Sequence, residues 1–221
     1  MIGIIGALEI EVKGLVSKME NIEVLNIKNL KFYKGELLER AVVVVQCGVG
    51  KVNSAMTTAI MINQFEIEYI INIGVAGGLA PELNIYDCVI SQSFVHHDLD
   101  ELSKEGRDSF EADAKLAQKA AQSAQAVLTD QNHNTFKGII ASGDQFISSK
   151  SEKDRIRSQF NALAVEMEGA SIAQVCSAFG IPFVGIRSIS DKADSNADGD
   201  FYAFLERAAQ NSISVILNML K

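Results

Sequence analysis

Short, apolar, β-branched runs alternate with longer stretches of helical periodicity along almost the whole chain. Runs such as residues 2–5 (IGII) and 41–46 (AVVVVQ) are typical of buried strands. Chains in which strands and helices alternate pack their helices against the faces of a largely parallel sheet. The sequence therefore predicts an α/β fold with three layers, α/β/α, around a mixed, mostly parallel central sheet.

The expected elements follow from these two periodicities. The strands are residues 2–5, 41–46, 69–73, 88–91, 136–141 and 183–186, with residues 32–37 as an additional strand that enters a hairpin. The helices are residues 9–19, 51–65, 112–128, 150–160, 168–179 and about 201–220. Because no Pro/Gly/Ser-rich linker divides the chain, residues 1–221 are predicted to form a single domain.

Size and charge exclude several classes of protein. The chain has 221 residues and a formal net charge of −8, whereas a nucleic-acid surface needs a basic stripe. No stretch reaches the roughly 18 apolar residues of a membrane-spanning helix, and the N-terminus lacks the basic and apolar regions of a signal peptide. We therefore expect neither a nucleic-acid partner nor a membrane partner.

The cysteines and histidines indicate no metal centre. Cys47, Cys88 and Cys176 are scattered, odd in number and without CxxC spacing, so neither a disulfide framework nor a zinc site is predicted. They are expected to be buried thiols in a reducing compartment, by default the cytoplasm. His96 and His97 would need a further ligand with suitable geometry to bind a metal, and no metal is expected.

Glycine-rich and acidic segments follow several of the predicted strands. Ligands of such folds bind beyond the carboxyl ends of the strands. The segments are residues 6–11 (GALEIE), 48–51 (GVGK), 74–78 (GVAGG), 164–170 (AVEMEGA) and 186–191 (IRSISD). The segment at 48–51 resembles a phosphate cradle at a helix start, but it lacks P-loop spacing, and a tight turn between helix and sheet is the competing interpretation. Several carboxylates that converge with an arginine at one sheet edge indicate a functional site.

The combination of these segments is more specific than any one of them. Residues 6–11, 48–52, 74–79, 142–146, 165–168 and 187–194 occur in the order found in 5'-methylthioadenosine/S-adenosylhomocysteine nucleosidases. The chain resembles this family, of the nucleoside phosphorylase-type superfamily, over nearly its whole length. The resemblance implies a homodimer that uses water, and no cofactor, to release adenine from 5'-methylthioadenosine, S-adenosylhomocysteine and 5'-deoxyadenosine.

The resemblance also implies roles for individual residues. Glu11 would position and deprotonate the attacking water, and Asp191 would protonate N7 of the departing adenine. Glu168 would accept hydrogen bonds from the ribose 2' and 3' hydroxyls. The other implied binding residues are Met167 under the sugar, Phe146 on the base, the backbone of Ile147 at the adenine edge, Arg187 near the water, Phe201 in the 5' pocket, and Glu166, Val75, Gly77, Val49 and Leu8.

Reaction chemistry agrees with this arrangement. Cleavage of a glycosidic bond builds oxocarbenium character on the ribose, and adenine is a poor leaving group as an anion. A general acid on the base side and a carboxylate-activated water on the opposite face of the sugar address both problems. The two carboxyls need different pKa values, which different burial and neighbours can supply.

Two departures from the family pattern concern specificity. Many members carry a longer stretch rich in aromatic residues, Gly and Pro where this chain has the short, charged connection 99–108, which is expected to leave the 5' pocket more open. Many members also have Ser at the position of Val75, so one possible hydroxyl contact near the water or the ribose is missing.

Three alternatives remain open at this point. A purine nucleoside phosphorylase would need cationic donors for phosphate, whereas this chain has Glu11 where that role is expected. A hydrolase of aminodeoxyfutalosine in menaquinone synthesis would use the same catalytic residues. A nucleoside-binding module without catalysis would not need Glu11, Glu168 and Asp191 together.

Overall fold

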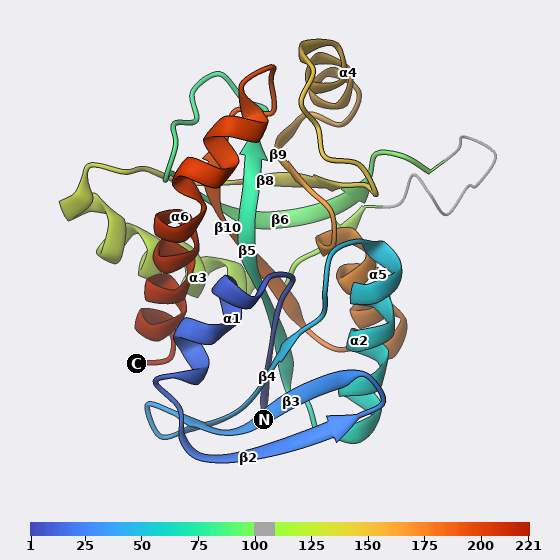
Figure 1. Cartoon of the computed structure of the whole chain (residues 1–221), viewed down its shortest axis with the longest axis vertical. Coiled ribbons are helices and arrows are strands. Elements are labelled where there is room, and N and C mark those ends of the chain that lie inside the picture. The colour runs from blue at the N-terminus through green and yellow to red at the C-terminus, as the bar shows by residue number, and fades with distance from the viewer. Residues whose placement is uncertain (100–108) are drawn as a thin grey trace.

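One mixed sheet organises the computed structural model, which describes residues 1–99 and 109–221 (Figure 1). Its strands are β1 (Ile2–Gly6), β2 (Glu20–Ile27), β3 (Leu30–Leu37), β4 (Arg40–Gln46), β5 (Tyr69–Gly78), β6 (Cys88–His96), β7 (Phe110–Glu111), β8 (Thr135–Ser142), β9 (Ala162–Glu166) and β10 (Phe183–Asp191). The helices are α1 (Glu9–Val16), α2 (Lys51–Gln64), α3 (Ala114–Leu128), α4 (Lys150–Phe160), α5 (Gly169–Phe179) and α6 (Ala197–Met219), with a 3-10 turn η2 (Thr129–Gln131).

The strand order is β10-β6-β8-β9-β5-β1-β4-β3-β2, with β7 paired to β6. Strands β4, β1, β5 and β10 are parallel neighbours, as are β6, β8 and β9. Antiparallel contacts join β10 to β6 and β5 to β9, so these five strands close into a ring of pairings. The β2–β3–β4 meander is also antiparallel and forms the free edge.

Helices cover both faces of the sheet, which confirms the three-layer prediction. In Figure 1, α1, α3 and α6 lie on one side and α2 and α5 on the other. Strand β4 contributes to both cores, because Val42 and Val44 pack beneath the first group of helices whereas Val43 and Val45 pack beneath the second. An uninterrupted valine run is therefore what this strand position requires.

The boundaries of several elements differ from the predicted ones. Strand β5 continues through the glycine-rich segment 74–78, which was expected to follow the strand, because β10 pairs with Gly74 and Val75 and β9 pairs with Gly77 and Gly78. Strand β10 likewise extends to Asp191. Segments 74–78 and 187–191 therefore lie on strand extensions, which hold them more rigidly than loops would.

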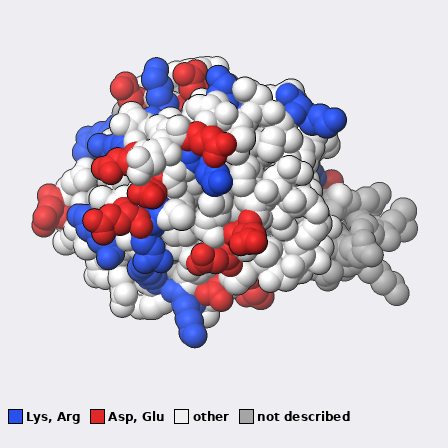
Figure 2. All heavy atoms as spheres, turned by 90° about the horizontal axis from the view of Figure 1, so that it is seen from below, with Lys and Arg blue, Asp and Glu red and all other residues white. Residues whose placement is uncertain are grey.

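The prediction missed strands β2, β7 and β9. Strand β2 (ENIEVLNI) is mostly exposed at the sheet edge, so it lacks the apolar pattern used to find the others. In the described residues no helix is long and apolar enough to cross a membrane. On the face shown in Figure 2, acidic and basic side chains are interspersed rather than gathered into a basic stripe.

Candidate active site

A cavity of about 240 Å³ opens where β1, β5, β9 and β10 end. Its lining includes twelve of the thirteen predicted site residues: Leu8, Glu11, Val49, Val75, Gly77, Phe146, Ile147, Glu166, Met167, Glu168, Asp191 and Phe201. Five lining residues were not predicted, namely Ala7, Ala76, Gln145, Val165 and Ser190. Segments that are up to 194 residues apart in the sequence (Ala7 and Phe201) are therefore brought to one place by the strand order.

Glu11 lies in the first turn of α1 and is 3% exposed. Its Oε2 accepts hydrogen bonds from the amides of Ala7 (2.7 Å) and Leu8 (2.8 Å), and its Oε1 accepts one from the amide of Val75 (3.2 Å). Burial raises the pKa of the Glu11 carboxyl, although these amides and Arg187 act in the opposite direction. The carboxyl is thus held rigidly with a raised affinity for a proton.

Asp191 ends β10 and is 2% exposed. Its Oδ1 accepts from the amide of Ala193 (2.8 Å), and its Oδ2 accepts from the hydroxyl of Ser190 (2.9 Å). Burial raises the pKa of the Asp191 carboxyl. A Cβ at Gly77 would lie 2.8 Å from Oδ1, so glycine at this position makes room for the carboxyl.

Glu168 immediately precedes α5, and its Oε1 accepts from the amide of Gly50 at the start of α2 (2.7 Å). Burial and then the charge of Glu166 raise the pKa of Glu168 to about 8. In the turn before α2, the amide of Gly50 therefore donates to Glu168, and the next amide, that of Lys51, donates to the carboxylate of Asp144 (2.8 Å). Carboxylates of the chain itself occupy the place where a phosphate was considered.

Arg187 is 1% exposed and is not among the lining residues. Its Nη2 donates to Glu166 Oε2 at 2.7 Å and to the side-chain oxygen of Asn72, and its Nη1 donates to the Asn72 carbonyl (3.0 Å). The Arg187 guanidinium therefore lies behind the cavity wall and is satisfied by protein groups, while its charge still acts on Glu11; its predicted place near the attacking water stays a prediction.

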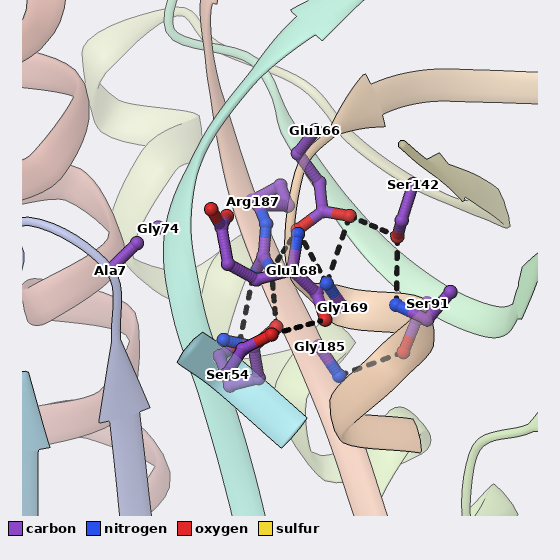
Figure 3. Close-up of polar contacts among 12 residues, drawn as sticks. Ala7, Ser54, Gly74, Ser91, Ser142, Glu166, Glu168, Gly169, Gly185 and Arg187 are labelled. Atoms are coloured by element: carbon purple, nitrogen blue, oxygen red, sulfur yellow. Dashed lines mark hydrogen bonds and ion pairs between the residues drawn. The ribbon is translucent and has the colours of Figure 1, made fainter. Parts of the chain in front are cut away.

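Glu166 lines the cavity and is also held by several protein groups. Its carboxylate accepts from the amides of Glu168 and Gly169, from the hydroxyl of Ser142 and from Arg187 (Figure 3). Asn72 and Ser142 were missed by the sequence analysis. A lone amide inside the apolar run 69–73 was the available signal for Asn72.

Aromatic side chains line another part of the cavity. The rings of Phe146 and Phe201 meet edge to face with centroids 5.6 Å apart, and Phe146 is 43% exposed. An exposed aromatic face beside a cavity is suited to a planar heterocycle. The described residues contain no cluster of three His, Cys, Asp or Glu side chains arranged to hold a metal ion.

Comparison with known proteins agrees with this geometry. A family model described as the phosphorylase superfamily matches residues 1–221. A 5'-methylthioadenosine/S-adenosylhomocysteine nucleosidase of Staphylococcus aureus (strain JH9) is 40% identical over 225 residues, which cover 98% of this chain and 97% of the relative. The chain belongs to this nucleosidase family. The resemblance inferred from the sequence segments is confirmed at this level.

Solved structures of nucleosidases share the fold. The enzyme of Neisseria meningitidis, in complex with methylthio-immucillin-A, superposes with a TM-score of 0.94 at 37% identity and covers 100% of this chain and 98% of its own. The native futalosine hydrolase of Helicobacter pylori strain 26695 has a TM-score of 0.90 at 36% identity and covers 99% of this chain and 96% of its own.

The two departures from the nucleosidase pattern have different outcomes. At Val75 the backbone amide, and not a side-chain hydroxyl, contacts Glu11. The valine therefore leaves the anchoring of Glu11 unchanged. The short connection 99–108, which was expected to open the 5' pocket, falls on residues 100–108, outside the described residues.

The buried carboxyl of Glu168 should make the stability of this nucleosidase depend on pH. Its pKa is raised from 4.5 to about 8 on folding, so the folded state holds a proton that the unfolded state has released between these pH values. Its contribution to stability is therefore present at low pH and is lost as pH rises towards 8. We expect Glu168→Gln to raise the melting temperature more at pH 8 than at pH 5.

Calorimetry at the two pH values measures this difference. The exposed Glu206→Gln is a control that should change the melting temperature equally at both pH values. An equal effect of Glu168→Gln at pH 5 and pH 8 would contradict the raised pKa.

Proposed function

We propose that this protein, as a single domain of residues 1–221, hydrolyses the N-glycosidic bond of 5'-methylthioadenosine and S-adenosylhomocysteine, and also of 5'-deoxyadenosine. The products are adenine and a 5-substituted ribose, which places the enzyme in methionine salvage and in removal of the methyl-cycle product. The observation that carries this proposal is that Glu11, Glu168 and Asp191 line one cavity together with Phe146 and Phe201.

Glu11 and Asp191 divide the proton transfers. Glu11 is the base that takes a proton from the attacking water, and its raised pKa makes it a stronger base than an exposed glutamate. Asp191 is the acid, because burial helps it to keep the proton that it gives to N7 of adenine. Glu168 accepts hydrogen bonds from the ribose hydroxyls, a capacity that its carboxyl keeps in the protonated form that its pKa of about 8 favours at neutral pH.

The remaining lining residues shape the substrate site. Met167 lies beneath the sugar, Phe146 stacks on the base, and the backbone of Ile147 meets the adenine edge. Phe201 lines the 5' pocket. Support for this arrangement comes from the apolar character and the common location of these side chains in one cavity.

A phosphorylase is disfavoured by the contents of the same cavity. Arg187 is satisfied by Glu166 and Asn72, and the amides of Gly50 and Lys51 donate to carboxylates. A phosphate dianion would meet Glu11 without a free cationic donor among the described lining residues. Neutral water fits this environment better.

Adenine release should therefore proceed at full rate in phosphate-free buffer. Millimolar phosphate should neither accelerate the reaction nor yield a sugar 1-phosphate, because Glu11 repels the anion. Phosphorus NMR of the products checks this outcome. A sugar 1-phosphate as the main product would move the protein to the phosphorylase class.

Hydrolysis of aminodeoxyfutalosine is a second candidate, favoured by the structural match to the futalosine hydrolase. It would use the same three carboxyls and differ only in the 5' group. Adenine release from a panel of 5'-substituted adenosines separates the two candidates. We expect 5'-methylthioadenosine and S-adenosylhomocysteine to be the better substrates.

We also propose that the protein is a homodimer. Val52 (78% exposed) and Met56 (38% exposed) lie one turn apart on α2, and Val49, which lines the cavity, is 46% exposed just before this helix. Light scattering should give twice the chain mass of 24.0 kDa, and Val52→Asp should shift the mass towards the monomer. A monomeric wild type would contradict this proposal.

A cytoplasmic location is the remaining part of the proposal. Cys47, Cys88 and Cys176 are free and buried. Unpaired thiols are typical of reducing compartments.

A further inference from the structure

Helix α5, unlike α3 and α4, begins without a cap from the side chain of the residue before it. The residue before a helix normally folds its side chain back onto the first free amides. Glu168 occupies that position, but its side chain makes no such bond and instead accepts from Gly50. The amides at the start of α5 must therefore be satisfied by other groups.

Two residues from neighbouring strands supply those groups (Figure 3). Glu166, at the end of β9, accepts from the amides of Glu168 (3.1 Å) and Gly169 (2.8 Å). Ser142, at the end of β8, accepts from the amide of Ala170 (2.7 Å) and donates to Glu166. The side chain of Glu168 is thus released from capping its own helix.

The Glu166 carboxylate is itself fixed by a charged partner. Arg187 donates to Glu166 Oε2 at 2.7 Å, and both side chains are at most 3% exposed. Asn72 accepts from the same guanidinium and donates to the Ile5 carbonyl (3.0 Å), which joins the pair to β5 and β1. The Glu166–Arg187 pair is therefore held by hydrogen bonds on both partners and tied to two strands.

We propose that Glu166 is a positioning residue for the sugar subsite: it caps α5 in place of Glu168, and so it presents the Glu168 carboxylate to the ribose diol. The proposal rests on the function proposed above and reassigns a residue first expected to touch substrate. Arg187 and Asn72 act through Glu166. The negative charge of Glu166 has a second effect, since it favours the protonated form of the nearby Glu168.

Space around the helix start limits other arrangements. A Cβ at Gly169 would lie 2.1 Å from a ring carbon of Phe94, so the helix start is pressed against β6. The hydroxyls of Ser54 and Ser171 contact each other at 2.6 Å, and Ser171 also donates to the Glu168 carbonyl. The backbone of Glu168 is therefore held from α2 as well, and its side chain, which the cap leaves free, reaches the amide of Gly50.

The test compares kcat/KM for 5'-methylthioadenosine and its 2'-deoxy analogue, because this ratio reports the contact between Glu168 and the 2' hydroxyl. Glu166→Gln should lower kcat/KM for the ribose substrate by about 10- to 100-fold, the range known for outer partners of metal ligands. Glu166→Gln should also reduce the ratio of kcat/KM for the ribose substrate to kcat/KM for the 2'-deoxy analogue, towards the ratio measured for Glu168→Gln. In the double variant the losses should not multiply, because Glu166 acts through Glu168.

Asp113→Asn is the matched control. Asp113 caps α3 by accepting from the amides of Lys115 and Leu116, away from the cavity. This variant should lower the melting temperature without changing the substrate ratio. If Glu166→Gln does not fold, Ser142→Ala keeps the Arg187 pair and should shrink the ratio by a smaller factor.

Two results would overturn the positioning role and leave the proposed function intact. One is an unchanged substrate ratio in every folded variant of Glu166 and Ser142. The other is multiplication of the two losses in the double variant. A wild-type enzyme that releases no adenine would overturn the proposed function and this assignment together.

Discussion

Glu11→Gln is expected to reduce kcat for adenine release at least about 100-fold, the usual scale for lost acid–base help. Glutamine keeps the size of the side chain and an oxygen for the amides of Ala7 and Leu8, so the fold should change little. It cannot accept the proton of the attacking water. Single-turnover adenine release checks the rate, and adenine binding checks that the site is intact.

The pH profile of the wild type adds a second readout. A base works when it is ionised, so kcat/KM should rise with pH through the raised pKa of Glu11. Glu9→Gln is the matched control, because Glu9 lies on the same helix with its side chain 77% exposed. A Glu11→Gln enzyme with near-normal kcat would show that another group activates the water.

Asp191→Asn is expected to have an effect of similar size, at least about 100-fold on kcat, because an amide cannot protonate N7. Asparagine can still accept from the amide of Ala193 through its one oxygen, and its NH2 group can donate to the hydroxyl of Ser190, so binding of substrate should be reduced less than turnover. The wild-type rate should fall as pH rises through the raised pKa of Asp191, because the acid must hold its proton.

The leaving group separates loss of an acid from general damage. A riboside with a nitrophenol leaving group needs no protonation, so Asp191→Asn should slow its hydrolysis much less than that of 5'-methylthioadenosine. Asp198→Asn, an exposed change in the first turn of α6, should alter neither rate. Equal losses on both substrates would contradict the role of Asp191 as the acid.

Local patterns were sufficient for the layers and for the carboxyls. Strand β4 is a run of valines because helices cover both of its faces. Each residue of such a strand is buried and therefore apolar, so the local sequence is enough to predict it. Glu11, Glu168 and Asp191 drew attention because a charged residue beside a buried strand is costly unless it is paired or functional, and their roles came from the resemblance of the six segments to the nucleosidase family. The sequence by itself thus determined the fold class and the candidate catalytic residues.

Only the tertiary structure decided which partners each of the buried charged groups has. Glu166 and Glu168 are two residues apart and have the same chemistry, yet one is used by Arg187 and the start of α5 and the other by Gly50. The partners of Arg187 lie 21 and 115 residues away in the sequence. Pairing at such separations depends on strand order and register, which no local sequence pattern encodes. The role of a buried charged side chain depends on its partner, so the sequence alone could not assign it.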